Sequence, residues 1–315
     1  MTGETPALFV EDLRKSYGAA AALRGLSLAV EAGRICGLIG PDGAGKTTAM
    51  RILCGLLRAD GGTARILGRD CTAEAVWVKE RIGYMPQRFS LYPDLTVAEN
   101  IRFFADLFGV PAEERAVREA RLMEFSRLAP FRKRRAGKLS GGMKQKLALC
   151  ATLIHTPRVL ILDEPTTGVD PVSRREFWQI LRELAEDGLA LLISTPYMDE
   201  ADLCDEVVLM HRGTAIARGA PSQLASLFPR RILEVSGAGL TEALVRLESA
   251  ALPGVAVRRF GDRLHLVYDD DGQAADTARL LEGCGVSIET ARPGVEDLFL
   301  ERMGAEEGSG EKGET

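Results

Sequence analysis

The sequence predicts an α/β domain with a largely parallel sheet, followed by a smaller α+β domain. Short apolar runs alternate with stretches of helical periodicity along most of the 315 residues, a pattern typical of parallel strands joined by helices. A glycine-rich segment directly follows one apolar run, and two adjacent acids end another. Beyond about residue 228 the alternation restarts as a separate unit, and a chain of this length favours two domains.

The strands of the first domain are predicted from apolar runs at residues 34–39, 159–162, 189–194 and 205–210. Two helices are predicted at residues 97–108 and 112–126, and Gly109 and Pro111 separate them because both residue types interrupt helices. We expect these helices to form a helical subdomain at about residues 88–155, within a first domain of residues 1–228.

The second domain, residues 229–303, is predicted to have the element order β-α-β-β-α-β-α. A short helix at 221–228 precedes it, and its elements are expected at 231–235, 240–250, 255–260, 263–268, 272–283, 286–290 and 295–302. A Gly261-Asp262 turn joins the two central strands. This order is compatible with a ferredoxin-like fold. Residues 304–315 are mostly Gly and Glu without an apolar anchor, so we expect a disordered tail.

The composition excludes several classes of protein. With 46% hydrophobic and 27% charged residues, the chain is neither intrinsically disordered nor fibrous. Its six cysteines form no C-x-x-C pair, which argues against a zinc site or a disulfide framework and favours buried, reduced thiols. No apolar run approaches the roughly 20 residues of a membrane span, and the first ten residues lack signal-peptide features, so we expect a cytosolic protein.

Charge argues against nucleic acid as a partner. The net charge is −5, whereas nucleic-acid-binding proteins usually present a basic surface. One basic cluster, residues 132–135 with Lys138, carries no interleaved aromatic residues and is interpreted as a solvated loop. The three histidines, His155, His211 and His265, lack the spacing of metal ligands and are interpreted as packing or surface residues.

A phosphate-binding loop follows the first predicted strand. The segment matches G-x-x-x-x-G-K-[ST] at every fixed position and precedes a predicted helix at 48–57. Its glycines let backbone N–H groups surround an anion, the lysine neutralises the outer phosphates, and Thr47 offers a hydroxyl to Mg²⁺. The predicted nucleotide-binding residues are Gly40, Pro41, Asp42, Gly43, Ala44, Gly45, Lys46, Thr47 and Thr48.

Two acids end the second predicted strand. Asp163 and Glu164 follow four apolar residues, and ligands of open α/β sheets lie outside such strand ends. Asp163 is therefore predicted to reach the metal through water and Glu164 to orient or deprotonate an attacking water. Taken alone, such a pair is also typical of a helix cap.

A serine and two glycines, Ser140, Gly141 and Gly142, precede a predicted helix at 144–154 and form a second candidate anion site. Together with the loop at 40–48, Gln87, the acids 163–164 and the Gly168-Val169-Asp170 segment, they make the chain resemble the ATP-binding cassette (ABC) ATPases. All these motifs occur in the family's order over about the first 225 residues. The resemblance implies the P-loop NTPase fold of that family.

The resemblance also implies roles for individual residues. Tyr17 would stack on adenine, and Gln87 would contact Mg²⁺ and report to a membrane partner. The segment 140–142 would close over the γ-phosphate held by a second subunit, and Asp170 would bridge the two subunits. The catalytic residues would be Glu164, Lys46 and Gln87, the metal ligands would be Thr47, Gln87 and Asp163, and the cofactors would be ATP and Mg²⁺.

One position departs from the family's pattern. Pro196 stands where these ATPases usually carry a switch histidine, and proline has no side-chain donor for the γ-phosphate. We therefore expect a slow ATPase.

The resulting interpretation is the ATPase subunit of a membrane exporter, a dimer held at the inner face of the membrane by separately encoded permease subunits. The stretch 88–100 and the segment 294–300 resemble the exporter branch, which includes drug and polysaccharide efflux ATPases. Two alternatives stay open: a soluble ABC ATPase acting on ribosomes or DNA, and a nucleotide-sensing regulatory subunit that does not turn ATP over.

Overall fold

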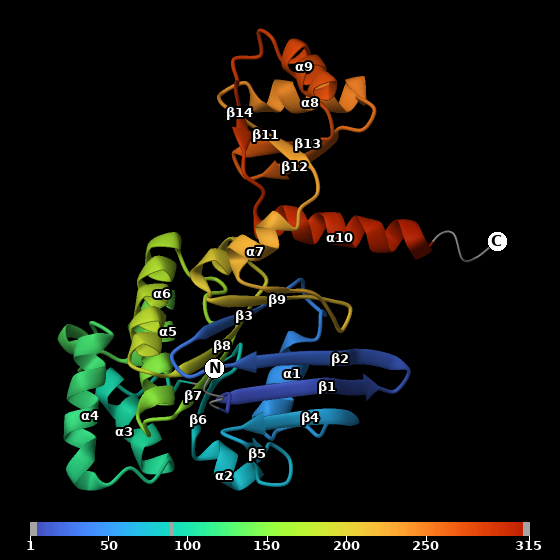
Figure 1. Ribbon diagram of the computed structural model, residues 1–315. Helices are drawn as coiled ribbons and strands as arrows, with labels where there is room; N and C mark the ends of the chain where they lie inside the picture. Colours follow the sequence, from blue (N-terminus) through green and yellow to red (C-terminus); the bar gives the residue numbers. More distant parts are fainter. Residues whose placement is uncertain (1–4, 89–90, 311–315) are drawn as a thin grey trace. The chain divides into compact units, whose positions relative to one another are not determined.

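The computed structural model describes residues 5–88 and 91–310 (Figure 1). The chain divides into two compact units, Met1–Pro221 and Ser222–Thr315. This division precedes the predicted boundary at residue 228, because Phe228 packs on Ile232 and Val267 of the second unit.

The first unit is built on a six-stranded sheet in the order β10-β9-β3-β8-β7-β6. Its strands are β3 (Ile35–Ile39), β6 (Ile82–Met85), β7 (Val159–Asp163), β8 (Ala190–Thr195), β9 (Glu206–His211) and β10 (Thr214–Gly219). All neighbouring strands are parallel except β10, which is antiparallel to β9. The four predicted strands are confirmed as β3, β7, β8 and β9, whereas β6 and β10 were not predicted.

A second, antiparallel sheet has the order β2-β1-β4-β5 and was not predicted. Its strands are β1 (Leu8–Tyr17), β2 (Ala20–Val30), β4 (Gly61–Ile66) and β5 (Arg69–Asp70). Helix α1 (Lys46–Leu53) contacts β2 and β4 of this sheet and β7 of the parallel sheet, so it lies between the two. The short helix α2 (Ala75–Lys79) contacts β6.

The region predicted as a helical subdomain contains α3 (Val97–Leu107), α4 (Ala112–Phe125) and α5 (Gly141–Leu153), which pack around their own apolar core. Thr96 and Glu99 form a capping box that starts α3. Helix α6 (Pro171–Glu186) packs on α5. The basic cluster 132–135 is exposed, as predicted, and all six cysteines are buried and unpaired. Among the described residues, no helix is both long and apolar enough to cross a bilayer.

The second unit has the predicted order of elements. Helix α7 (Pro221–Ser226) begins at the division, and β11 (Arg231–Ser236), α8 (Leu240–Ala250), β12 (Ala256–Phe260), β13 (Arg263–Tyr268), α9 (Asp271–Leu280), β14 (Ser287–Ala291) and α10 (Val295–Gly310) follow. The strands form an antiparallel sheet in the order β12-β13-β11-β14. This arrangement agrees with the predicted ferredoxin-like fold.

The predicted disorder from residue 304 is wrong up to Gly310, where α10 ends. The first turns of this helix are anchored by buried Val295, Leu298 and Phe299. Once a helix is nucleated, each further residue adds one hydrogen bond, so it extends past its apolar anchor. Residues 311–315 of the predicted tail lie outside the described residues.

An ion pair fastens α10 to the sheet. His265 Nδ1 on β13 lies 2.9 Å from Asp297 Oδ1 on α10, and its Nε2 lies 3.7 Å from Glu234 Oε2 on β11. The hydrogen bond to Asp297, which is 1% exposed, raises the pKa of His265 above its ordinary 6.5. Arg263 pairs with Glu234, and Arg258 donates to the main-chain oxygen of Asp297.

The raised pKa predicts how the stability of the second unit depends on pH. Because the folded state binds the proton of His265 more tightly than the unfolded state, the pair contributes fully below about pH 6.5, and its contribution is lost as pH rises through the folded pKa. We expect amide hydrogen exchange in α10 to accelerate relative to α8 as pH rises above neutrality, after correction for intrinsic exchange. His265→Asn should remove this dependence, and an equal dependence in both proteins would contradict the assignment.

Candidate functional site

The candidate site lies at the carboxyl ends of four adjacent parallel strands. The loop 40–48 follows β3, residues 194 and 195 end β8, Asp163 ends β7 with Glu164 directly after it, and Gln87 follows β6. Because the sheet order is β3-β8-β7-β6, these four segments meet at one edge (Figure 1). The predicted loop, acids and glutamine are therefore brought together by the fold.

The loop has the tight backbone that its glycines permit. Gly45 has φ +102°, and a Cβ there would lie 2.4 Å from Ala22 O. A Cβ at Gly40 would lie 2.2 Å from Met210 O. Larger residues at either position would displace the main chain of neighbouring strands.

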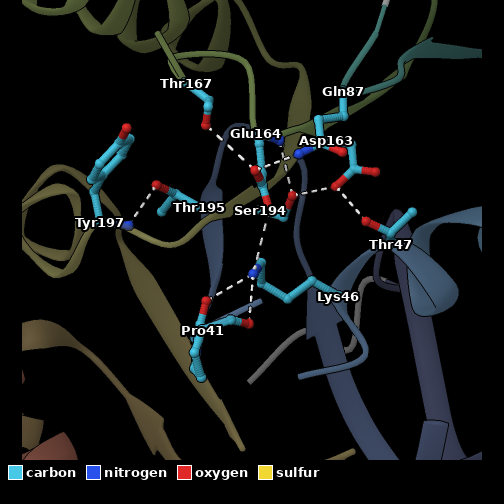
Figure 2. Close-up of polar contacts among 11 residues, drawn as sticks. Pro41, Lys46, Thr47, Gln87, Asp163, Glu164, Thr167, Ser194, Thr195 and Tyr197 are labelled. Carbon is cyan, nitrogen blue, oxygen red and sulfur yellow. Dashed lines mark hydrogen bonds and ion pairs between the residues drawn. The ribbon is translucent and has the colours of Figure 1, made fainter. Parts of the chain in front are cut away.

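Lys46 is almost completely buried at the first turn of α1. Its Nζ donates to Gly40 O at 2.7 Å and Pro41 O at 3.0 Å, and lies 3.5 Å from Glu164 Oε1 (Figure 2). The ammonium group is thus fixed beside the start of the loop, and it is paired with the carboxylate of Glu164, which is predicted to activate water. A buried cation of this kind can neutralise phosphate charge at little cost in side-chain entropy.

Asp163 ends β7 and is buried. Its Oδ1 accepts hydrogen bonds from Thr47 Oγ1 at 3.1 Å and Ser194 Oγ at 2.6 Å, whereas its Oδ2 is buried and has no partner among the described residues. The described residues contain no group of three His, Cys, Asp or Glu that could hold a metal. One spare carboxylate oxygen beside a threonine hydroxyl fits Mg²⁺ that arrives with nucleotide phosphates, since Mg²⁺ commonly binds through one or two carboxylates plus phosphate.

Glu164 follows Asp163 in a left-handed backbone conformation, with φ +50°. Its Oε2 accepts from Gln87 Nε2 at 2.9 Å and Thr167 Oγ1 at 3.4 Å. Neither acid caps a helix, because Asp170 is the N-cap of α6. The helix-cap interpretation of the pair is therefore wrong, and both carboxylates instead contact side chains of the site at the strand edge.

A cavity of about 510 Å³ opens beside the loop. It is lined by Ala22, Asp42, Gly43, Ala44, Gly45, Lys46, Thr47, Thr48, Gln87 and Glu164. A second cavity of about 390 Å³, the subdomain groove, is lined by Gln87, Arg88, Leu91, Pro93, Ala136, Gly137, Lys144, Gln145 and Ala148. Gln87 lines both cavities. Tyr17 lies at the end of β1, is half exposed, and is not among the residues that line the loop cavity.

Ser140 and Asp170 both act as helix caps. Ser140 Oγ accepts from Met143 N at 3.3 Å, so α5 begins at Gly141, three residues before the predicted helix at 144–154, with Gly141 and Gly142 in its first turn. Asp170 Oδ1 accepts from Ser173 N and Val172 N, and these hydrogen bonds lower the pKa of Asp170. None of the residues 140–142 or Asp170 lines the loop cavity of its own chain.

The segment around Pro196 is held by its neighbours. Tyr197 N donates to Thr195 Oγ1 at 3.1 Å, and the Arg174 guanidinium stacks 4.2 Å from the centre of the Tyr197 ring. The buried Glu200 accepts from Thr166 Oγ1 at 2.7 Å, which ties this segment to the one that follows Glu164. Sequence reasoning placed Ser194 only at the end of a predicted strand and in the segment that carries Pro196, and it did not identify Ser194 or Thr167 as contacts of the acids.

Comparisons with known proteins agree with this geometry. The ABC transporter family model matches residues 23–167. The probable multidrug ABC transporter ATP-binding protein YbhF of Escherichia coli is 43% identical over 281 residues, which are 89% of this chain and 48% of that protein. The Nod factor export ATP-binding protein I of Paraburkholderia xenovorans is 37% identical over 302 residues, 95% of this chain and 98% of that protein.

A solved structure of the ATP-binding subunit of an ABC transporter is similar at 29% identity and a TM-score of 0.63, covering 70% of this chain and 93% of that one. The chain spans about half the length of YbhF, and nearly the whole length of the Nod factor protein. The order of the motifs, the strand-edge site and these matches all indicate the same family. The chain therefore belongs to the ATP-binding subunits of ABC transporters.

Proposed function

We propose that this chain binds and hydrolyses ATP with Mg²⁺ as the energising subunit of a membrane exporter. The observation that carries the proposal is the convergence of Lys46, Asp163, Glu164 and Gln87 at one strand edge beside a cavity of about 510 Å³. Backbone amides and a fixed lysine suit phosphate binding, and a buried carboxylate suits activation of water. Mg²⁺ would neutralise phosphate charge between Thr47, Asp163 and Gln87.

Each residue has a task in this proposal. The loop 40–48 and Lys46 would bind the phosphates, Asp163 would help to hold the metal through water, and Glu164 would take the proton from the attacking water. In the present structure Glu164 is paired with Lys46, so phosphate binding would compete for the ammonium group and free the carboxylate.

A second subunit completes the site in this proposal. Ser140, Gly141 and Gly142 present main-chain amides at the start of α5, away from their own loop cavity. We propose that they close on the γ-phosphate bound by a second copy or a related chain, with Asp170 near the seam. Two nucleotides would then be enclosed by a head-to-tail pair.

The membrane partner would be a separately encoded permease. The subdomain groove offers apolar Leu91 and Pro93 beside Arg88 and Lys144, which suits a short amphipathic helix with acidic residues. This contact would hold the chain at the inner face of the membrane. The export direction follows the names of the relatives, a multidrug transporter protein and a Nod factor export protein.

Steady-state ATP hydrolysis by the full chain with Mg²⁺ tests the proposal. We expect measurable turnover together with ATP-dependent dimerisation. Pro196 favours a second candidate function, a nucleotide-sensing subunit, because proline offers no donor to the γ-phosphate. Binding of ATP without turnover, either alone or as a homodimer, would support that candidate instead.

Replacing Pro196 tests whether the missing donor limits the rate. We expect Pro196→His to retain ATP affinity, because the residue does not line the loop cavity, and to raise turnover by adding a donor for the phosphate. The measurement is kcat and KM for ATP in both proteins. Pro196→Ala is the control for the change in backbone freedom. Equal rates in the histidine and alanine variants would contradict the prediction.

A further inference from the structure

A single buried hydroxyl touches both acids of the site. Ser194 is the second-last residue of β8, is 0% exposed, and follows an apolar run in that strand. In the parallel ladder between β7 and β8, Ser194 is paired directly with Asp163. A buried hydroxyl requires hydrogen-bond partners, so the partners of Ser194 show which groups it positions.

The Ser194 hydroxyl both donates and accepts a hydrogen bond. Ser194 Oγ donates to Asp163 Oδ1 at 2.6 Å and accepts from Glu164 N at 3.0 Å (Figure 2). A serine has one hydroxyl proton, and here that proton is committed to Asp163. In the part of the chain that the structure describes, no other side chain is hydrogen-bonded to both residues of the acid pair.

For Asp163, the contact fixes the plane of the carboxylate. Its Oδ1 is shared between Ser194 and Thr47, and Oδ2 is the buried oxygen that has no partner in the described part of the chain. If Thr47 turns its hydroxyl to a metal, Ser194 is the donor that still holds Oδ1. A hydrogen bond from a hydroxyl to a carboxylate is charge-assisted and short, which suits this task.

For Glu164, the contact supports an unusual backbone. A left-handed conformation, here with φ +50°, is strained for a residue with a side chain and persists only where its surroundings hold it. The Glu164 amide is held by Ser194 Oγ and also by Ser194 O at 3.1 Å. The direction in which this carboxylate leaves the main chain therefore depends on Ser194.

We propose that Ser194 is a positioning residue for the metal nucleotide: its hydroxyl orients Asp163 toward the cation and supports the conformation that presents Glu164 to the attacking water. The inference rests on the proposed ATPase function. The end of β8, which leads to Pro196, is thereby hydrogen-bonded to the acid pair through Ser194.

The test compares Ser194→Ala with the wild-type full chain. ATP affinity is measured by calorimetry with excess Mg²⁺ and with EDTA, and the ratio of the two affinities reports the metal-dependent part of binding. We expect the affinity in EDTA to stay within about twofold and the Mg²⁺-dependent ratio to fall about tenfold, the size of one charge-assisted hydrogen bond. We expect kcat to fall at least about tenfold, since misplaced groups lose rate steeply.

Two further variants serve as controls. Ser194→Thr keeps the hydroxyl and should retain most of the Mg²⁺-dependent ratio. Ser126→Ala removes an equally buried serine hydroxyl, which donates to Leu122 O at 2.7 Å in the helical subdomain, and should leave the ratio unchanged. Thermal unfolding of all four proteins reports whether each is folded.

The outcomes separate this inference from the proposed function. An unchanged Mg²⁺-dependent ratio in Ser194→Ala overturns the inference, and so does an equal loss of affinity with and without Mg²⁺, which would mean a structural role only. Absence of turnover in the wild type overturns the proposed hydrolysis, while the binding ratio still decides the role of Ser194.

Discussion

Glu164→Gln is expected to lower ATP turnover by about 10²-fold or more, the range of a lost general base, while ATP still binds. Glutamine keeps the shape of the side chain and can still accept the hydrogen bond from Gln87, but it cannot take a proton from water. It also loses the charge that pairs with Lys46, which leaves the ammonium group available to phosphate. We therefore expect an ATP-bound dimer that persists.

Steady-state phosphate release and size-exclusion chromatography with ATP measure the two effects. Glu183→Gln, on the exposed face of α6, removes the same charge away from the site and should leave both unchanged. A Glu164→Gln protein that turns over at the wild-type rate would refute the assignment of Glu164 as the base.

Lys46→Met is expected to remove ATP binding and turnover together. Methionine occupies a similar volume, but it leaves Gly40 O and Pro41 O without their donor and Glu164 without its cation. Hydrogen bonds to charged groups contribute about 1.5–3 kcal/mol each, so loss of the phosphate contacts predicts a fall in affinity of about 100-fold or more.

Equilibrium binding of ATP to Lys46→Met, beside Lys79→Met, measures this effect. Lys79 is exposed at the end of α2, so its replacement removes one positive charge without touching the loop. Tight binding of ATP by Lys46→Met would contradict the role of the loop. If both variants lost ATP binding, the loss would be due to the changed net charge of the protein and not to the contacts of Lys46.

Three of the four strands that build the site, β3, β7 and β8, were predictable, because each is an apolar run buried on both faces, whereas β6 was not. The antiparallel sheet β2-β1-β4-β5 was not predictable, because β1 pairs with β2 through register shifts near Val10, Leu13 and Lys15. Each shift moves inward-facing residues out of the regular alternation that identifies a strand from its sequence. Helix and strand order in the second unit was predictable, since its turns and amphipathic helices are local features.

The contiguous parts of the site were predictable for a related reason. In the loop 40–48 the main-chain amides would bind the phosphates, which requires glycines and Lys46 at fixed spacing. The role of Ser194 depends on the pairing of β7 with β8, which joins residues 31 positions apart. The one available signal was a serine at the end of a buried apolar strand, whose hydroxyl had to find a partner.

Gln87 lines two cavities, so ligands that bind in the two cavities are expected to influence each other's affinity. Its amide contacts Glu164 in the loop cavity and also lines the subdomain groove. Ligands that compete for, or reinforce, the placement of one side chain are energetically coupled, and coupling of binding free energies is reciprocal. If a helix in the groove changes the affinity for ATP by some factor, ATP must change the affinity for that helix by the same factor.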